Sequence, residues 1–122
     1  MTDEQTEQEI QAKGLTAPRV TPADIEAEIY AEHYFTAREG ASHPDAVSKY
    51  PVETPAGYVP SLGLLTFCVL ALRNGFTVTG ESACASPENF DAELGRKIAR
   101  QNAMAKVWPL LGFRLRDQLA SK

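Results

Sequence analysis

The stretch GESAC, residues 80–84, contains two side chains that act as nucleophiles in enzymes, the hydroxyl of Ser82 and the thiol of Cys84. A thiol nucleophile needs a nearby base, which is most often a histidine. The two histidines of the chain, His33 and His43, lie far upstream and in no motif that indicates a catalytic dyad. Cys84 is therefore interpreted as a small, buried strand residue.

Serine and metal chemistry also lack their usual patterns. The nucleophile turn of serine hydrolases reads Gly-x-Ser-x-Gly and needs a histidine later in the chain. Cys84 stands at the second glycine position, and no histidine follows Ser82. A zinc site needs ligands clustered at short spacing, which the isolated histidines do not provide. We therefore expect a protein that is not an enzyme and that uses no cofactor and no metal.

Two arginines indicate a different chemistry, the binding of an anion. Arg96 and Arg100 are one helical turn apart, so both guanidinium groups can hold one phosphate or carboxylate. Lys106 adds a third cation further along the same predicted helix. Other nearby side chains are suited to reading ribose or base edges, or to stacking on a base. The predicted ligand-binding residues are therefore Arg96, Arg100, Lys106, Phe76, Phe90, Asn89, Glu81 and Ser82.

An alternative interpretation of the basic helix is structural. In it, Arg96, Lys97 and Arg100 form a solvated face or pair with the acidic first helix, and they bind no ligand. The charge distribution suits this alternative as well. Residues 1–32 contain eight acidic and two basic residues, whereas residues 94–122 contain seven basic residues and one acidic residue.

Length and composition narrow the class of protein. A chain of 122 residues fits one small domain. Its net charge of -4 argues against binding to a nucleic-acid polymer. The longest apolar stretch, residues 62–72, is too short to cross a bilayer, and the acidic N-terminus is unlike a secretory signal. We expect no membrane partner and a cytoplasmic location.

The first third of the chain is predicted to contain a tail and one helix. Residues 1–18 are polar and acidic, which predicts a flexible tail, or a helix that forms only against a partner. Residues 19–122 are expected to form a single domain. Thr21 and Pro22 predict the start of a helix that continues to Gly40. Its apolar face would contain Ile25, Ile29, Tyr34 and Phe35.

Residues 64–73 and 76–85 predict a β-hairpin turning at Asn74-Gly75. A two-residue loop would place Cys68 opposite Glu81 and Phe67 opposite Ser82. In that register Cys68 and Cys84 point to opposite faces, so no disulfide is expected between them. The first strand is apolar on both faces, which predicts a central strand or one covered on both sides.

The segments before and after the hairpin are predicted to be a loop and two helices. Residues 40–61 contain four prolines, which predicts a loop with an extended piece at residues 50–52. Ser86 and Pro87 predict a helix over residues 87–107, and Pro109 would bend or end it before a short last helix at 113–119. The stripe expected to pack on the hairpin is Phe90, Leu94, Ile98, Gln101, Ala105 and Trp108.

These elements predict an α+β fold. An antiparallel hairpin or small sheet would pack against an N-terminal helix and a C-terminal helix pair. The predicted ligand-binding residues would then gather at the junction between the second strand and the basic helix. There the positive end of the helix dipole also attracts anions.

The segment LLTFCVLALRNGFTVTGESACASPENFDAELGRKIARQNAMAKVWPLLGF, residues 64–113, resembles a family of small bacteriophage proteins. This family includes the first type of Thoeris anti-defence protein, a phage sponge. The motifs that carry the resemblance are the NGFxVTGESAC hairpin, the PENFD helix start and the GRKIARQNAxxKxWPLxGF helix end. The resemblance extends over about residues 20–119.

The resemblance implies a protein that binds cyclic ADP-ribose isomers made by TIR-domain sensors and holds them intact, so that the Thoeris effector stays inactive. It also implies binding of cyclic di- or trinucleotides from CBASS immunity at a separate site. The implied assembly is a homodimer or a hexamer built as a trimer of dimers, in the cytoplasm of the host bacterium. An alternative function is an early phage protein that inhibits a host protein by direct contact through its acidic N-terminus and first helix.

Overall fold

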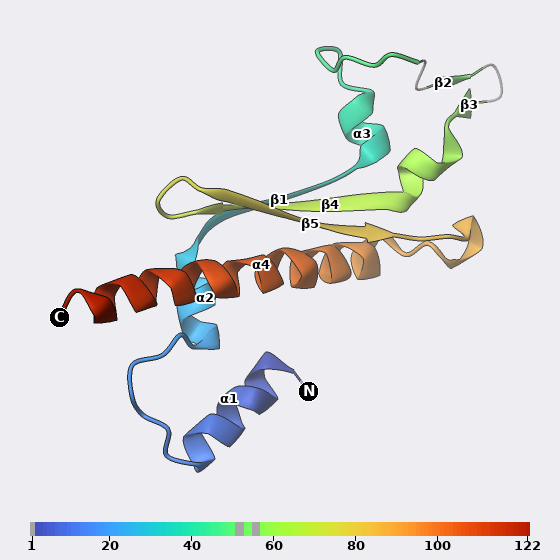
Figure 1. Ribbon diagram of the computed structural model, residues 1–122. Helices are drawn as coiled ribbons and strands as arrows, with labels where there is room; N and C mark the ends of the chain where they lie inside the picture. Colours follow the sequence, from blue (N-terminus) through green and yellow to red (C-terminus); the bar gives the residue numbers. More distant parts are fainter. Residues whose placement is uncertain (1, 51–52, 55–56) are drawn as a thin grey trace.

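The computed structural model of the chain describes residues 2–50, 53–54 and 57–122. Its centre is a three-stranded antiparallel sheet in the order β1-β4-β5, with one long helix, α4, lying along one face (Figure 1). The fold is α+β, as predicted. The bounds of these elements are β1 Ile29–Thr36, β4 Leu65–Leu72, β5 Thr77–Ala83 and α4 Ala92–Ala120.

Shorter elements surround this centre. Of the extended piece expected at residues 50–52, residues 51 and 52 lie outside the described residues. No helix in the described part of the chain is long and apolar enough to span a membrane. The remaining elements are α1 Asp3–Ala12, α2 Pro22–Glu28, α3 Ala37–Ala41, β2 Glu53–Thr54, β3 Gly57–Tyr58 and the 3-10 turns η1 Pro60–Leu64 and η2 Pro87–Asn89.

The helix start at Thr21 is confirmed, but the predicted length of the helix is wrong. The Thr21 hydroxyl accepts a hydrogen bond from the Asp24 amide at 3.1 Å, and the Asp24 carboxylate accepts one from the Thr21 amide at 2.9 Å. The helix ends at Glu28, and residues 29–36 form strand β1. Branched and aromatic residues dominate this segment, and pairing with β4 satisfies its backbone groups.

The N-terminal segment contains helix α1. Thr2 caps this helix, and the carboxylate of Asp3 accepts a hydrogen bond from the indole of Trp108 at 3.1 Å. Glu7 and Arg19 form an ion pair between α1 and the start of the domain. No residue of α1 is buried. The segment is thus helical in the structure, and its mobility stays a prediction.

The hairpin is confirmed, but its register differs from the predicted one by one residue. The Leu72 amide donates to the Phe76 carbonyl at 2.8 Å, so the loop contains residues 73–75 rather than two residues. Gly75 takes the left-handed conformation, with φ of 90°. A turn followed by one left-handed residue is a common three-residue hairpin loop. Cys68 therefore pairs with Gly80, and Glu81 pairs with Phe67.

This shift corrects the interpretation of both cysteines. With Cys68 opposite Gly80, the even-numbered positions of β5 share its face, and Cys84 continues that side. The two cysteines therefore do not point apart. They are four residues apart in register, roughly 13 Å along the strand, and this distance prevents a bridge. Both are free, and Cys84 is half-buried just beyond the end of β5 rather than fully buried within it.

The core lies between α4 and the sheet, and small residues form the contact. The buried residues of α4 are a stripe of Gly95, Ala99, Ala103, Val107 and Leu111. The predicted stripe is wrong, because Leu94 is 53% and Ile98 is 38% exposed. The reason is close approach: a methyl group at Gly80 would lie 2.2 Å from the Ala99 backbone oxygen. Large residues do not fit at this contact.

Two features of α4 also differ from the prediction. Its N-cap is Asp91, whose carboxylate accepts from the Leu94 amide at 3.0 Å, whereas Ser86 makes no side-chain cap. The predicted C-terminal helix pair is a single helix that continues through Pro109. Pro109 removes the hydrogen bond to the carbonyl of Ala105, and because that residue is exposed, water can satisfy the freed carbonyl.

The predicted central position of the strand over residues 64–73 is confirmed, since β4 lies between β1 and β5. Alternate residues of β4 are buried on the side that faces α4. On the other face Phe67 stacks on Phe35 with ring centroids 5.6 Å apart. Within the described residues, only one face of the sheet is covered by a long helix (Figure 1).

Candidate functional site

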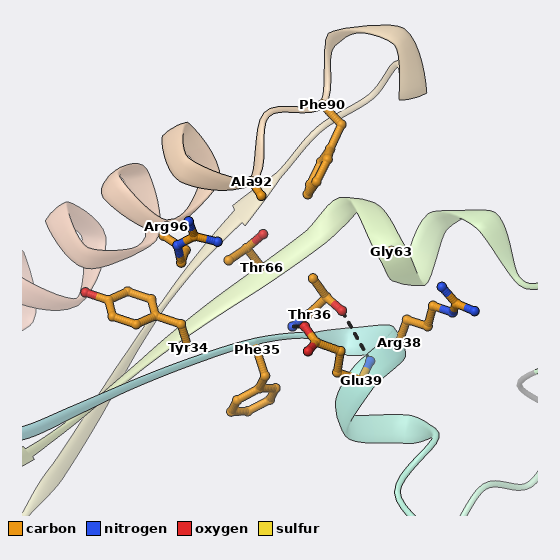
Figure 2. Close-up of a pocket in the computed structure, with 10 residues that line it drawn as sticks. All are labelled: Tyr34, Phe35, Thr36, Arg38, Glu39, Gly63, Thr66, Phe90, Ala92 and Arg96. Carbon is orange, nitrogen blue, oxygen red and sulfur yellow. Dashed lines mark hydrogen bonds between the residues drawn. The ribbon is translucent and has the colours of Figure 1, made fainter.

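The candidate site that contains predicted ligand-binding residues is a cavity of about 370 Å³ at the end of the sheet away from the hairpin turn. Two more open hollows, of about 450 and 460 Å³, contain none of those residues. The walls of the first cavity come from β1, α3, the start of β4 and the start of α4 (Figure 2). Binding sites for small molecules typically enclose about 300–1,000 Å³, so this volume suits a small ligand or part of a larger one. Two of its lining residues, Arg96 and Phe90, are among the predicted ligand-binding residues.

Arg96 supplies the positive charge on the α4 side of the cavity. It lies just over one turn into α4, and in Figure 2 it is drawn on the α4 wall, across the cavity from Thr36 and Glu39. Among the described residues it forms no hydrogen bond and no ion pair. An exposed, unpaired guanidinium can donate two parallel hydrogen bonds to a phosphate or carboxylate. Arg96 is thus available to an anionic ligand.

Phe90 and Ala92 bring the start of α4 to the same cavity. Phe90 follows the turn η2 and is half-buried, with its ring directed into the cavity (Figure 2). The N-terminus of α4 attracts anions, but the carboxylate of Asp91 already caps it. The main positive charge on this wall is therefore that of Arg96, with the Phe90 ring as an apolar surface beside it.

Residues 36–39 form the opposite wall, and sequence reasoning missed them. The Glu39 carboxylate accepts from the Thr36 amide at 2.9 Å, and the Thr36 hydroxyl accepts from the Glu39 amide at 3.2 Å. This reciprocal pair caps α3 and fixes both side chains at the cavity. The sequence Thr-Ala-Arg-Glu carries the capping-box signature, which indicates a helix start. Extending the previous helix through residue 40 obscured that signal.

Arg100 does not line this cavity, although it is one turn from Arg96. It pairs with Glu26 of α2 at 2.9 Å and with Glu32 of β1 at 3.1 Å. Hydrogen bonds that Arg100 donates to Glu26 and Glu32 hold the pKa of Arg100 above its ordinary value, and accepting the bond from Arg100 lowers the pKa of Glu32. For Arg100 the structure therefore agrees with the alternative interpretation, in which this arginine pairs with acidic residues of the first helix. It links α4 to α2 and β1.

The hydroxyl of Tyr34, which lines the cavity, donates to the same Glu32 carboxylate at 2.8 Å. Burial, together with this hydrogen bond, raises the pKa of Tyr34 above its ordinary value. The Arg100 ion pairs therefore also fix one wall of the cavity. Arg100 influences the candidate site through Glu32 and Tyr34 rather than by contact with a ligand.

The other predicted residues lie outside the large cavity. Ser82 and Asn89 line a separate cleft of about 150 Å³ that shares Phe90 with the cavity. Phe76 is 55% exposed beside the hairpin turn, at the far end of the sheet. Glu81 lies on the sheet face away from α4, and its backbone carbonyl accepts from Asn102 at 2.8 Å. Lys106 is exposed on α4.

Comparison with known proteins places the chain among bacteriophage proteins. Residues 20–119 match the model of a family described as "Phage protein (N4 Gp49/phage Sf6 gene 66) family". The chain belongs to this phage protein family. No curated protein and no solved structure matches it. The match begins after α1 and includes every wall of the large cavity, so the candidate site lies within the family region.

The described residues of this phage protein contain no group of three or more histidine, cysteine or acidic side chains placed to hold a metal ion. Neither Ser82 nor Cys84 lines the large cavity. The thiol of Cys84 lies 3.2 Å from the Ser86 carbonyl, within the range of a sulfur hydrogen bond. The lining of the cavity thus contains arginines, aromatic rings, hydroxyl groups and a carboxylate.

Proposed function

We propose that this phage protein is a non-catalytic sponge for cyclic nucleotide immune signals in the host bacterial cytoplasm. Its ligands would be cyclic ADP-ribose isomers from Thoeris TIR proteins, and cyclic di- or trinucleotides from CBASS. The observation that carries the proposal is the cavity of about 370 Å³ that brings together the ring of Phe90 and Arg96, which has no partner within the described part of the chain. The resemblance in the hairpin and helix motifs supplies the class of ligand.

The chemistry of the cavity suits a nucleotide with a pyrophosphate. Arg96 would neutralise a phosphate, and a hydrogen bond to a charged group contributes about 1.5–3 kcal/mol. Phe90 would stack on adenine, which contributes about 1–3 kcal/mol per base. The hydroxyls of Thr36 and Thr66 add hydrogen-bonding groups that suit ribose. None of these contacts requires a bond to be broken.

The proposed assembly is a homodimer, or a hexamer built as a trimer of dimers. Two apolar surfaces support it. Leu94 and Ile98 are exposed on α4, and Phe35 and Phe67 stack on the sheet face away from α4. Exposed apolar groups of this kind are common at interfaces between copies.

Titration calorimetry tests the proposal against a panel of cyclic ADP-ribose isomers and cyclic oligonucleotides. At least one cyclic nucleotide is expected to bind with a saturable stoichiometry. Linear ADP-ribose, which has the same adenine, ribose and pyrophosphate groups, serves as the comparison. Absence of binding across the whole panel would contradict the proposal.

A second candidate function is inhibition of a host protein through the acidic N-terminus. Helix α1 favours it, because α1 lies outside the family match and none of its residues is buried. Deletion of residues 1–18 separates the two functions. Inhibition of a host protein should be lost, while binding of a cyclic nucleotide in the cavity should persist.

A further inference from the structure

The large cavity carries charges of opposite sign on opposite walls. Arg96 enters from α4, and Glu39 enters from α3 (Figure 2). Among the described residues the two side chains form no ion pair with each other. A cation and a carboxylate that share a cavity without neutralising each other favour a ligand that has an anionic group at one end and hydrogen-bond donors at the other.

Glu39 is held at its wall by the hydrogen bonds that cap α3. One carboxylate oxygen accepts from the Thr36 amide at 2.9 Å. An ionised carboxylate offers about four acceptor positions, so this bond leaves several of them to a ligand. Because an ionised carboxylate accepts hydrogen bonds and does not donate them, it attracts hydroxyl and amino groups and repels a phosphate.

Arg38 also lines the cavity and is a possible source of compensating positive charge. The side chain of Arg38 extends away from Arg96, whereas the carboxylate of Glu39 lies beside Thr36 (Figure 2). Arg38 is moreover already engaged with another group. The local charge next to Thr36 is therefore that of Glu39.

We propose that Glu39 makes the cavity selective for nucleotides with free ribose hydroxyls and excludes nucleotides that carry an additional phosphate on the ribose. This inference rests on the proposed function. In it, Arg96 holds the pyrophosphate while Glu39 accepts hydrogen bonds from the ribose hydroxyls. Dinucleotide-binding domains make the same chemical distinction, with an acidic residue for the free 2′-hydroxyl and an arginine for the 2′-phosphate.

Calorimetry with two probes tests this selectivity: cyclic ADP-ribose and its derivative phosphorylated on the 2′-hydroxyl of the adenosine ribose. The wild-type protein is expected to bind the unphosphorylated probe at least about tenfold more tightly, because like charges placed together are strongly unfavourable. Glu39→Gln keeps the shape of the side chain and the capping acceptor. It should reduce the ratio of the two affinities several-fold.

Glu93→Gln is the matched control. Glu93 is an exposed acid on α4 that pairs with Lys97 and does not line the cavity, so its removal should leave the ratio unchanged. Equal affinity of the wild type for both probes, or an unchanged ratio of the two affinities in Glu39→Gln, would overturn the proposed role of Glu39. Either result would leave the proposed sponge function standing. Absence of binding of both probes by all three proteins would overturn the cyclic ADP-ribose sponge as well.

Discussion

At the scale of single residues, Arg96 and Arg100 show how one helical turn separates two different roles. Both arginines suit an anion, and their spacing on the sequence gives no reason to distinguish them. The structure distinguishes them, because Glu26 and Glu32 surround Arg100 and leave Arg96 beside the cavity. The relevant acids belong to α2 and β1, and a strand at residues 29–36 was not part of the predicted fold.

Arg96→Ala is expected to weaken binding of a cyclic nucleotide about 10- to 100-fold, because it removes a charged hydrogen bond to phosphate. Lys97→Ala removes the same charge from the adjacent position. Lys97 pairs with Glu93 and does not line the cavity, so its loss should change the affinity less than about threefold. Calorimetry on both variants makes the comparison, and equal losses of affinity would argue against the cavity as the site.

Arg100→Met is expected to act on stability. It leaves Glu26 and Glu32 without their cation, and the free energy of unfolding at neutral pH should fall by about 1–2 kcal/mol. Urea denaturation at several pH values measures this loss.

The sign of the pH dependence follows from Glu32. Its pKa in the folded protein is lowered from 4.5 by Arg100, so the stabilisation is present above that value and is lost as the pH falls below it. In Arg100→Met this loss on acidification should be smaller. The same loss in both proteins would show that the ion pair does not set the pH dependence.

At the scale of elements, the sequence predicted the positions of turns and helix starts better than it predicted which faces of the helices and strands pack together. Thr21 and the hairpin turn after Leu72 carry local signals, and both are confirmed. The loop length was wrong because Asn74-Gly75 suits a two-residue turn and also the end of a three-residue loop. That difference of one residue placed Glu81 on the wrong face of the sheet.

The packing face of α4 was missed for a physical reason. Hydrophobic periodicity favours large residues such as Leu94, whereas the contact with the sheet is made by glycine and alanine. Only the position of Gly80 beneath α4 explains why small residues are required there. The capping box at residues 36–39, which shapes the cavity, was present in the sequence but hidden by the overlong helix.

Gly80→Ala tests this close contact. Its methyl group would collide with backbone atoms of Ala99 and Ala103, so the variant should lose at least about 2 kcal/mol of stability, or fail to fold. Gly112→Ala is the control, because nothing lies within 4 Å of its added methyl group. Alanine at that helical position should raise stability by about 0.5–1 kcal/mol. Thermal unfolding measures the stability of both variants. An unchanged stability of Gly80→Ala would contradict the close contact between β5 and α4.

The docking of α1 can be followed with Trp108, the single tryptophan of the chain. Because α1 contributes the Asp3 carboxylate to the indole, deletion of residues 1–14 should shift the emission to longer wavelength and increase quenching by acrylamide. Lys13→Ala breaks only the pair with Glu9 at the end of α1 and should leave the emission unchanged. Unchanged emission after the deletion would indicate that α1 does not cover Trp108.

At the scale of the whole molecule, the acidic first third and the basic last third partly neutralise each other. Arg100 pairs with Glu26 and Glu32, and Arg114 pairs with Glu28 at 2.5 Å. Composition suggested either an anion site or an interface for the acidic segment. The chain uses two of these bases, Arg100 and Arg114, for the second purpose, internally, whereas Arg96 forms no such pair among the described residues.

The central claim is that the protein holds a cyclic nucleotide without altering it. The direct measurement is to saturate the purified protein with a cyclic ADP-ribose isomer, remove the unbound ligand, denature the protein by heat and identify what is released by mass spectrometry. We predict recovery of the intact cyclic nucleotide, and much less from Arg96→Ala than from Lys97→Ala. Release of a cleaved product, or of no nucleotide, would contradict the account.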